Sequence, residues 1–338
     1  MPSKIKVLVI DDSLLFREVL ARGLSSDDQI DVVAKAADPF EALGAIIQFK
    51  PDVITCDVEM PRMNGIEFVK RLMPQYPVPV IIVSSLNGLV IDAMNAGAVS
   101  YVSKPYKQES SALNLFIVDL IANIKGVYGA KAIQSQSVIP KVVRKMHIDD
   151  QKLIAIGAST GGTQALSQLI LSLPYNMPGI VIVQHIPQNF SKMFAERMDA
   201  QSHFKVVEAE NGMYIKPNHV FIAPGGKHMC VLKTGSLYKI RIFEDEKMNG
   251  HCPSVDVLFH SVAKYTKRKA IGIILTGMGS DGAKGLLHLK QQGGRTIGQD
   301  EESSVVYGMP KAAYKMGAVD RQLPLSGIAN AICDLLRT

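Results

Sequence analysis

Hydrophobic residues recur in short runs along the chain, most regularly in its first 125 residues. Five apolar runs alternate there with segments whose apolar residues are spaced as on one face of a helix. The runs are rich in valine and isoleucine without strict alternation, which is typical of strands buried on both faces. The pattern predicts a five-stranded parallel sheet covered by helices on both sides. The predicted strands are residues 5–10, 31–36, 52–56, 78–83 and 98–102.

The alternation stops at residues 126–150, which show no sustained periodicity, and we interpret them as a linker. It resumes in residues 151–338, which predict a doubly wound, mostly parallel α/β sheet. Between residues 205 and 246 short apolar runs are separated by Pro-Gly-Gly and Thr-Gly-Ser, which predicts an antiparallel hairpin region. The expected domains are therefore residues 1–125 and 151–338. Strands are predicted at 153–158, 179–184 and 270–275, and helices at 162–173, 191–200, 254–264 and 281–292.

Composition narrows the class of protein. A chain of 338 residues with 47% hydrophobic residues has room for two folded domains. Its four cysteines are far apart and include no Cys-x-x-Cys pair, which argues against a zinc knuckle or a disulfide framework and fits a reducing cytosol. No apolar run approaches the roughly 20 residues that a membrane span needs. We expect a cytoplasmic protein without membrane insertion.

The net charge of +6 is unevenly distributed. Residues 1–125 hold 12 Lys and Arg against 15 Asp and Glu, whereas residues 126–338 hold 25 against 16. A basic second half fits either nucleic acid or a negatively charged protein partner. Its basic residues are scattered, however, and the chain has no tryptophan and few aromatic residues for base stacking. We expect no nucleic-acid partner.

Polar residues follow four of the first five predicted strands. Asp11 and Asp12 end the first strand, Asp57 follows the third, Ser84 ends the fourth and Lys104 follows the fifth. Because parallel strands all end at one edge of a sheet, these side chains converge there. Clustered carboxylates favour a hard cation such as Mg²⁺, and an aspartate can act as the nucleophile toward a phosphoryl donor. Any single one of these aspartates is as well explained as a helix cap.

The second half contains the ingredients of a nucleophilic triad. Segment 157–161, Gly-Ala-Ser-Thr-Gly, lies between a predicted strand and a predicted helix, where the flanking glycines permit a tight bend that exposes Ser159. His185 ends the next strand and Asp281 follows a third, so that a serine, a base and an orienting acid meet at one edge. The alternative for Ser159 is an ordinary helix cap. We expect the other histidines to be surface or structural residues: His147, His203, His219, His228, His251, His260 and His288.

Segment 277–282 supports a competing interpretation. Gly-Met-Gly-Ser-Asp-Gly fits the dinucleotide-binding pattern G-x-G-x-x-G, follows a strand and has Asp300 eighteen positions further on. Asp281 argues against it, because its carboxylate would lie against the pyrophosphate where only backbone N–H groups are wanted.

The first domain resembles the response-regulator receiver domain in three motifs: Ile-Asp-Asp-Ser, Cys-Asp-Val-Glu-Met-Pro and Lys-Pro. The resemblance implies a flavodoxin-like fold that is phosphorylated on Asp57 by a chemotaxis histidine kinase of a two-component system. It implies Mg²⁺ ligands from Asp12, Asp57 and the backbone carbonyl of Glu59, with Asp11 assisting. It also implies that Ser84, Tyr101 and Lys104 respond to phosphorylation.

The second domain resembles the CheB family of chemotaxis protein-glutamate methylesterases in Ile-Gly-Ala-Ser-Thr-Gly-Gly-Thr, Gln-His-Ile-Pro and Leu-Thr-Gly-Met-Gly-Ser-Asp-Gly-Ala. The resemblance implies phosphorylation-activated hydrolysis of glutamate methyl esters on methyl-accepting chemoreceptors, with release of methanol, and deamidation of receptor glutamines. It makes Ser159 the nucleophile, His185 the general base and acid, and Asp281 its orienting partner. It gives the oxyanion donors as the backbone N–H groups of Thr160 and Met278, with no cofactor for the ester chemistry.

Two alternatives belong to other classes. A non-catalytic, phosphorylation-dependent binding module would use the same fold with Ser159 as a helix cap. A receiver joined to a DNA-binding output domain is disfavoured because no helix-turn-helix-like segment follows.

Overall fold

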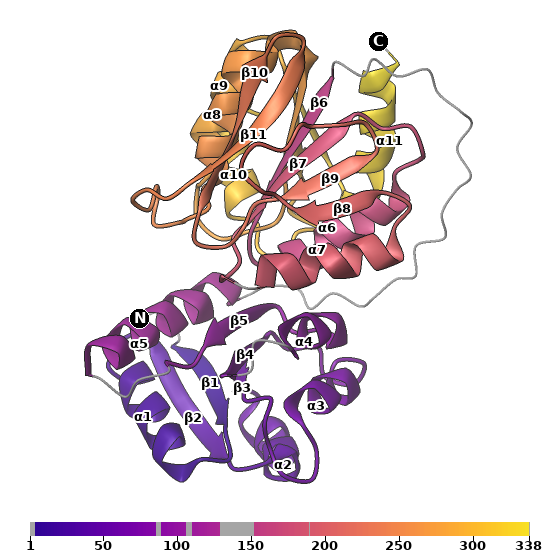
Figure 1. Ribbon diagram of the computed structural model, residues 1–338. Helices are drawn as coiled ribbons and strands as arrows, with labels where there is room; N and C mark the ends of the chain where they lie inside the picture. The colour runs from indigo at the N-terminus through magenta and orange to yellow at the C-terminus, as the bar shows by residue number, and fades with distance from the viewer. Residues whose placement is uncertain (1–3, 86–88, 106–109, 129–151, 189, 338) are drawn as a thin grey trace. The chain divides into compact units, whose positions relative to one another are not determined.

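The chain divides into two compact units, Met1–Gln136 and Ser137–Thr338. The computed structural model describes residues 4–85, 89–105, 110–128, 152–188 and 190–337 (Figure 1). Most of the predicted linker, residues 126–150, lies outside the described residues. Its first two residues, Gly126 and Val127, belong to the end of a helix.

The first unit is built on a five-stranded parallel sheet in the order β2-β1-β3-β4-β5. Helices α1 and α5 cover one face and α2, α3 and α4 cover the other (Figure 1). The strands are β1 (Ile5–Ile10), β2 (Ile30–Ala36), β3 (Val53–Cys56), β4 (Val80–Ser84) and β5 (Ser100–Ser103). The helices are α1 (Leu14–Leu24), α2 (Pro39–Phe49), α3 (Gly65–Leu72), α4 (Val90–Ala96) and α5 (Ser110–Val127).

Short polar side chains start three of these helices at the carboxyl edge of the sheet. Ser13 caps α1, Asp38 caps α2 and Asn64 caps α3, each accepting hydrogen bonds from backbone N–H groups of the first turn. Such caps satisfy donors that have no partner inside the helix. They also fix where each loop leaves its strand, which holds the loops of this edge in place.

The second unit contains a seven-stranded sheet in the order β14-β13-β12-β6-β7-β9-β8, in which every neighbouring pair is parallel. A separate antiparallel pair, β10 and β11, lies outside it. The sheet strands are β6 (Leu153–Ala158), β7 (Gly179–Gln184), β8 (Lys205–Glu208), β9 (His219–Ile222), β12 (Ala270–Ile274), β13 (Arg295–Gln299) and β14 (Arg321–Leu323). The antiparallel pair is β10 (His228–Thr234) and β11 (Leu237–Phe243).

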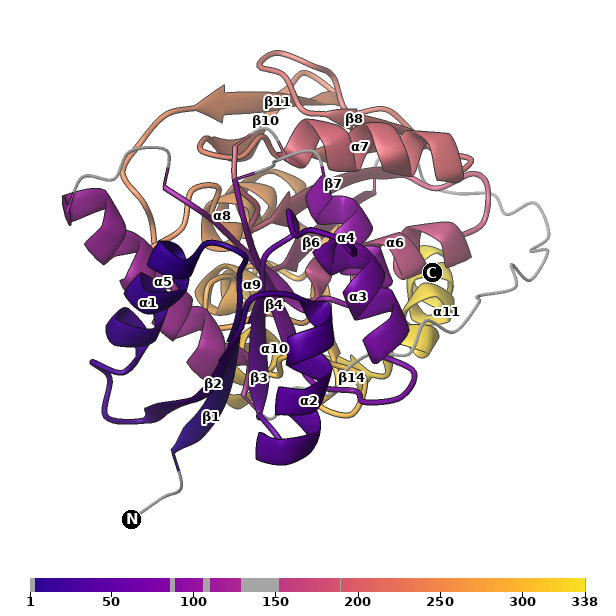
Figure 2. The same cartoon turned by 90° about the horizontal axis from the view of Figure 1, so that it is seen from below.

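Helices cover both faces of this larger sheet (Figure 2). Helices α8, α9 and α10 lie on one face, and α6, α7 and α11 lie on the other. Their bounds are α6 (Gly162–Ser172), α7 (Phe190–Gln201), α8 (Val255–Thr266), α9 (Ala283–Gln291), α10 (Met309–Lys315) and α11 (Leu325–Leu336). The three central strands β12, β6 and β7 are buried along their whole length, in agreement with their apolar sequences.

The hairpin region contains one hairpin, not two. Gly235 and Ser236 form the two-residue turn between β10 and β11. The Pro-Gly-Gly segment, predicted as a second hairpin turn, instead follows β9, whose neighbours β7 and β8 are both parallel to it. The reason is close packing, since a Cβ on Gly225 would lie 2.5 Å from the backbone oxygen of Pro187. That glycine admits a neighbouring loop and does not reverse the chain.

Within the part of the chain that the structure describes, no helix is long and apolar enough to cross a membrane.

Candidate functional site

Ser159 and His185 lie at the ends of two adjacent parallel strands. The last paired residues of β6 and β7 are Ala158 and Gln184, and the backbone N–H of His185 donates to the carbonyl of Ala158 at 3.0 Å. Neighbouring strands are about 4.8 Å apart, so the residues that follow them are held side by side. The sheet register therefore determines the spacing of these two residues.

A tight turn carries Ser159 from β6 into α6. Its N–H donates to the carbonyl of Thr276 at 3.0 Å, and its own carbonyl accepts from the N–H of Gly162 at 2.7 Å. Gly161 has a φ of 74°, a left-handed conformation that favours glycine. The serine precedes the helix, as the motif predicts, but it is half-buried and not fully exposed.

His185 contacts Asp281 directly. The distance from His185 Nε2 to Asp281 Oδ2 is 2.9 Å, and both side chains are buried. An ionised carboxylate can only accept, so Nε2 carries the proton and Nδ1 keeps its lone pair. Nδ1 is buried and has no hydrogen-bond partner among the described residues, the Ser159 hydroxyl included. The structure thus presents a free basic nitrogen next to the strand end that holds the serine.

Asp281 accepts hydrogen bonds from five donors. Besides His185, these are Asn249 Nδ2 and Ser254 Oγ, each at 2.8 Å, and the backbone N–H groups of Val255 and Asp256, at 2.7 and 3.2 Å. Burial alone would raise the pKa of Asp281, but the hydrogen bonds, led by those from His185 and Asn249, outweigh it and hold the pKa well below its usual range. Asp281 is therefore a permanent anion that fixes the tautomer of His185.

The segment before α8 contributes residues that sequence reasoning missed. Asn249 and Gly250 have φ angles of 53° and 82°, and they reverse the chain between Met248 and His251, whose backbones pair. Asn249 reaches Asp281, and the ring of His251 stacks on that of His185 with centroids 3.7 Å apart. His251, expected at a surface or in a purely structural role, is thus part of the candidate site. The Asn249-Gly250 pair could have indicated the turn before His251, because Asn-Gly is typical of tight turns.

Thr160 and Met278 are the predicted oxyanion donors. Among the described residues, neither backbone N–H donates a hydrogen bond to another protein group. Met278 is in the loop after β12, where a Cβ on Gly277 would come within 2.7 Å of the Ser159 Cβ. Gly277 therefore lets this loop approach the serine closely, and the two N–H groups can both serve the candidate site.

The same loop disfavours the dinucleotide interpretation. The Asp281 carboxylate is buried and bonded entirely to donors of its own chain. The glycines on either side of it accommodate close contacts with Ser159 and Val255. Packing within the site thus explains Gly277 and Gly282, and a φ of 85° explains Gly279.

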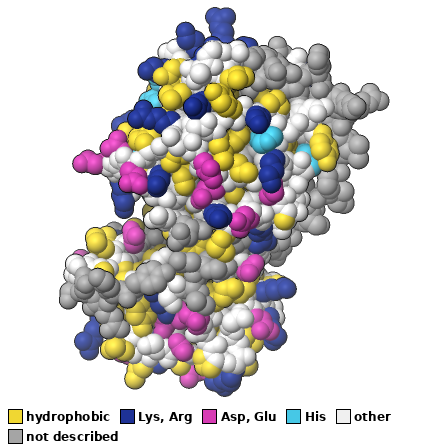
Figure 3. Space-filling model, viewed as in Figure 1, with side chains coloured by type: hydrophobic (Ala, Val, Ile, Leu, Met, Phe, Trp, Pro, Cys, Tyr) yellow, Lys and Arg dark blue, Asp and Glu magenta, His cyan; other side chains and the backbone are white. Residues whose placement is uncertain are grey.

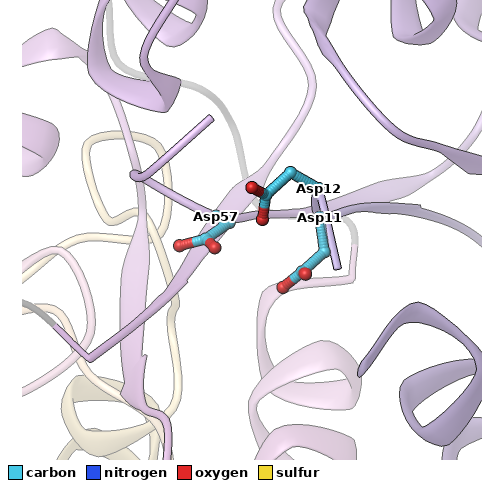
Figure 4. A group of neighbouring side chains, drawn as sticks. All are labelled: Asp11, Asp12 and Asp57. Carbon is cyan, nitrogen blue, oxygen red and sulfur yellow. The ribbon is translucent and has the colours of Figure 1, made fainter. Parts of the chain in front are cut away.

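The first unit gathers three carboxylates at the ends of β1 and β3 (Figure 4). Carboxylate oxygens of Asp11, Asp12 and Asp57 all lie within 4.8 Å of one another. Lys104 Nζ is 2.5 Å from Asp57 Oδ2 and 2.7 Å from Asp11 Oδ2. A set of oxygen donors of this kind fits Mg²⁺, which favours carboxylates and keeps several waters. The structure thus brings together the aspartates and the lysine that the sequence predicted at this edge of the sheet.

Burial raises the pKa of Asp57 above its usual range, although the hydrogen bond from Lys104 acts in the opposite direction. For Lys104, burial acts to lower the pKa, but hydrogen bonds to Asp11 and Asp57 outweigh it and raise the pKa. The other oxygen of Asp57 accepts from the N–H groups of Val58 at 2.6 Å and Glu59 at 3.3 Å. The pocket therefore holds more negative charge than its one lysine neutralises, a state that a divalent cation would relieve.

The predicted switch residues are connected through one backbone carbonyl. The Tyr101 hydroxyl donates to the carbonyl of Ser84 at 2.8 Å, and the Lys104 N–H donates to the same carbonyl at 3.0 Å. The end of β4 is thus linked by hydrogen bonds to Tyr101 on β5 and to Lys104 just after it.

On the face of the second unit that Figure 3 shows, basic side chains are dispersed, although five of this unit's basic residues line one pocket: Lys233, Lys264, Lys267, Arg268 and Lys269. Figure 3 shows the unit's Lys and Arg side chains separated by acidic, apolar and other groups on the visible face. This face lacks the continuous basic stripe that is typical of nucleic-acid sites.

The fold and the two sites together define a class of protein. One unit is a receiver-like parallel sheet with an acidic pocket, and the other is an α/β sheet with a serine beside a histidine–aspartate pair. This is the organisation of a response regulator whose output domain is a hydrolase.

Comparisons with known proteins identify the family. Residues 154–332 match the family model described as CheB methylesterase, and residues 7–115 match that of the response regulator receiver domain. The chain belongs to the CheB methylesterase family. The family resemblance and the fold class expected from the sequence are both confirmed.

Relatives match over nearly their full length. The chain is 50% identical over 335 residues to the protein-glutamate methylesterase/protein-glutamine glutaminase 2 of Syntrophomonas wolfei, with 98% of each chain covered. It is 42% identical to the corresponding enzyme of Salmonella typhi, covering 97% of this chain and 95% of that one. The crystal structure of the Thermotoga maritima CheB methylesterase catalytic domain matches with a TM-score of 0.53 and 40% identity, covering 54% of this chain and 98% of that chain.

Proposed function

We propose that the chain hydrolyses methyl esters of glutamate side chains on methyl-accepting chemoreceptors, releases methanol, and also deamidates receptor glutamines. The relatives named above support the substrate class, since their names describe both activities. The observation that carries the assignment to residues is the unpartnered Nδ1 of His185, a residue that follows the strand paired with that of Ser159 and whose Nε2 contacts Asp281. A buried base without a partner is suited to take a proton from a bound reactant.

The proposed reaction is a two-step acyl transfer. Ser159 Oγ attacks the ester carbonyl while its proton passes to His185 Nδ1, and the N–H groups of Thr160 and Met278 hold the oxyanion. The tetrahedral intermediate collapses as His185 returns the proton to the departing methoxy oxygen, which gives methanol and a glutamyl ester on Ser159. Water then adds to this ester while His185 takes one of its protons, and His185 returns that proton to Ser159 Oγ as the acyl–oxygen bond breaks, which leaves a glutamate side chain on the receptor and restores the enzyme. In deamidation, ammonia replaces methanol as the leaving group.

The receiver unit is proposed to control this chemistry. A chemotaxis histidine kinase supplies the phosphoryl group, and Asp57 accepts it as an acyl phosphate. Asp11, Asp12, Asp57 and the Glu59 carbonyl would hold Mg²⁺, which would neutralise charge on the phosphoryl oxygens. Lys104, already bonded to Asp57, is placed to bind the same oxygens. Ser84 and Tyr101 would change their contacts, and hydrolysis would increase.

The test is methanol release from methylated chemoreceptor membranes, with and without a small phosphodonor and Mg²⁺. We expect release without the donor and faster release with it, since the same chain carries catalyst and switch. Methanol release that does not change with the phosphodonor would support the esterase activity and contradict its control by phosphorylation.

The competing function is a phosphorylation-dependent binding module. It predicts that the chain associates with receptors but releases no methanol or ammonia under any of these conditions. The His185–Asp281 contact disfavours it, because a helix cap at Ser159 needs neither residue. We also propose that the enzyme acts in the cytoplasm.

A further inference from the structure

We propose that His251 is a positioning residue that holds the ring plane of His185 so that Nδ1 faces Ser159. The inference rests on the proposed function of Ser159, His185 and Asp281 and adds a fourth side chain to it. His251 lies four residues before the start of α8 and is far in sequence from all three.

The geometry of the two rings carries the proposal. Their centroids are 3.7 Å apart and their planes differ by 11°, so the rings are nearly parallel and in contact. His185 is buried, with its side chain 8% exposed, and His251 is half-buried on top of it. One face of the His185 ring is thus covered by another flat ring.

The hydrogen bond of the His185 side chain to Asp281 leaves one motion of the ring unrestrained. The contact with Asp281 fixes the position of Nε2, but the ring can still turn about that contact. Nδ1 has no polar partner among the described residues that would oppose this turn. A ring stacked on the face opposes it directly, because turning would push atoms of His185 into His251. The hydrogen bond acts in the ring plane and the stack acts perpendicular to it.

One short segment, residues 248–254, supports both the carboxylate that binds His185 and the ring that stacks on it. The turn at Asn249 and Gly250 pairs the backbones of Met248 and His251, with N–H to carbonyl distances of 3.1 and 3.0 Å. Asn249 of this turn binds Asp281, and Ser254 just beyond it binds the same carboxylate. The ring of His251 therefore has a rigid backbone anchor that is tied to the partner of His185. A stack on a free loop end would not give this precision.

The charge state of His251 is compatible with this role. Burial, reinforced by the neighbouring His185 and by Lys247, lowers the pKa of His251 to about 4, although Asp281 acts in the opposite direction. The ring is therefore neutral at pH 7. A neutral face tolerates the positive charge that His185 acquires during the reaction, whereas a protonated neighbour would repel it.

The experiment compares His251→Ala and His251→Phe in the full chain by methyl-ester hydrolysis on receptor membranes at pH 7.5. We expect His251→Ala to lower kcat about 10- to 100-fold with little change in KM, since misorientation of a catalytic group affects the reaction more than binding. His251→Phe keeps a flat ring and should restore kcat to within about threefold of the parent. His219→Ala, which removes a histidine stacked on Phe221 elsewhere in the unit, is the matched control and should retain full activity.

A spectroscopic measurement separates orientation from general stability. In ¹⁵N-histidine-labelled protein, the His185 ring should be the Nε2–H tautomer in the parent and in His251→Phe. In His251→Ala the ring should keep this tautomer, because Asp281 is unchanged, but its ¹⁵N signals should broaden as the ring turns, with the far-UV circular dichroism spectrum unchanged. Parent kcat and His185 ¹⁵N signals as sharp as in the parent in His251→Ala would overturn the proposal. Failure of His251→Phe to recover kcat would also overturn it, because the imidazole itself would then be required. Hydrolysis that persists in Ser159→Ala would instead show that the proposed triad is wrong.

Discussion

The two units place a buried aspartate at the same topological position, the carboxyl edge of a parallel sheet, but surround it in opposite ways. Asp281 accepts from five donors, and its pKa is held below the usual range. Asp57 is next to two other carboxylates, and burial raises its pKa despite the bond from Lys104. Asp57 accepts from three donors, Lys104 and the N–H groups of Val58 and Glu59, and its lysine also contacts Asp11.

This difference corresponds to the chemistry that each aspartate is proposed to perform. An aspartate that orients a base must stay ionised and stationary, which a full set of donors ensures. An aspartate that must bind a cation and attack phosphorus needs unused acceptor capacity. A buried carboxylate whose pKa is raised thus indicates a reacting group, and one whose pKa is lowered by many donors indicates a supporting group. The predictions below test this comparison.

The largest effect is expected at Ser159, which lies at the strand end beside that of His185, the partner of Asp281. Ser159→Ala removes the proposed nucleophile and should lower hydrolysis by about four orders of magnitude or more, with the fold retained. The assay is methanol release, with circular dichroism to check folding. Ser172→Ala, whose hydroxyl only bonds the Leu169 carbonyl in the same helix, should keep parent activity. Near-parent turnover in Ser159→Ala would remove the nucleophilic role.

Replacing the satisfied carboxylate should affect stability as well as rate. Asp281→Asn should reduce the free energy of unfolding at pH 7 by about 3 kcal/mol, because several buried donors lose a charged acceptor. The folded-state pKa of Asp281 is lowered, so its stabilisation is complete above the unfolded value of about 3.9 and is lost as the pH falls below it.

The gap between Asp281→Asn and the parent should therefore narrow on acidification. Urea unfolding of both proteins at pH 7 and at pH 3.5 measures it. A gap that is equal at both pH values would mean that the charge of Asp281 contributes nothing.

Asp57 should matter for regulation and not for basal hydrolysis. Asp57→Asn should keep basal hydrolysis but lose the whole response to phosphodonor and Mg²⁺, which for coupled sites is typically about 5- to 150-fold. Chelation of Mg²⁺ should abolish the response of the parent in the same way. Asp119→Asn, an exposed change on α5, is the control and should respond normally. Activation of Asp57→Asn would place the phosphoryl acceptor at another residue.

The smallest effect is expected from removing one of the five donors to Asp281. Asn249→Gly keeps the positive φ of the turn but deletes the amide, and kcat should fall about tenfold, equivalent to about 1.4 kcal/mol. Asn218→Gly makes the same change at another positive-φ position in the unit and should leave kcat unaltered. An equal loss in both variants would point to general destabilisation.

The sequence was a good guide wherever function coincides with a strand end. Apolar runs followed by Asp57, Ser159 and His185 reveal both the strand and the edge at which its next residue lies. The pairing of β6 with β7 then brings Ser159 and His185 together without further information. This is why both pockets were found from periodicity and motif.

The sequence was a poor guide where loops are shaped by tertiary contacts. Asn249, His251 and Ser254 reach the site through an irregular segment between β11 and α8, whose course depends on Asp281. Strand β13 was not predicted, because its sequence, Arg-Thr-Ile-Gly-Gln, is not an apolar run. Four of its five residues are nevertheless buried by the neighbouring strands and helices. The Pro-Gly-Gly segment after β9 was misassigned since its glycine serves packing, which local sequence does not reveal.

The most direct test of the central claim is labelling of the full chain with a serine-reactive fluorophosphonate, followed by mass spectrometric mapping of the modified residue. The account predicts a single rapidly labelled serine, Ser159, and a large loss of labelling in His185→Ala because the base is gone. Labelling of a different serine, or undiminished labelling of Ser159 in His185→Ala, would contradict it.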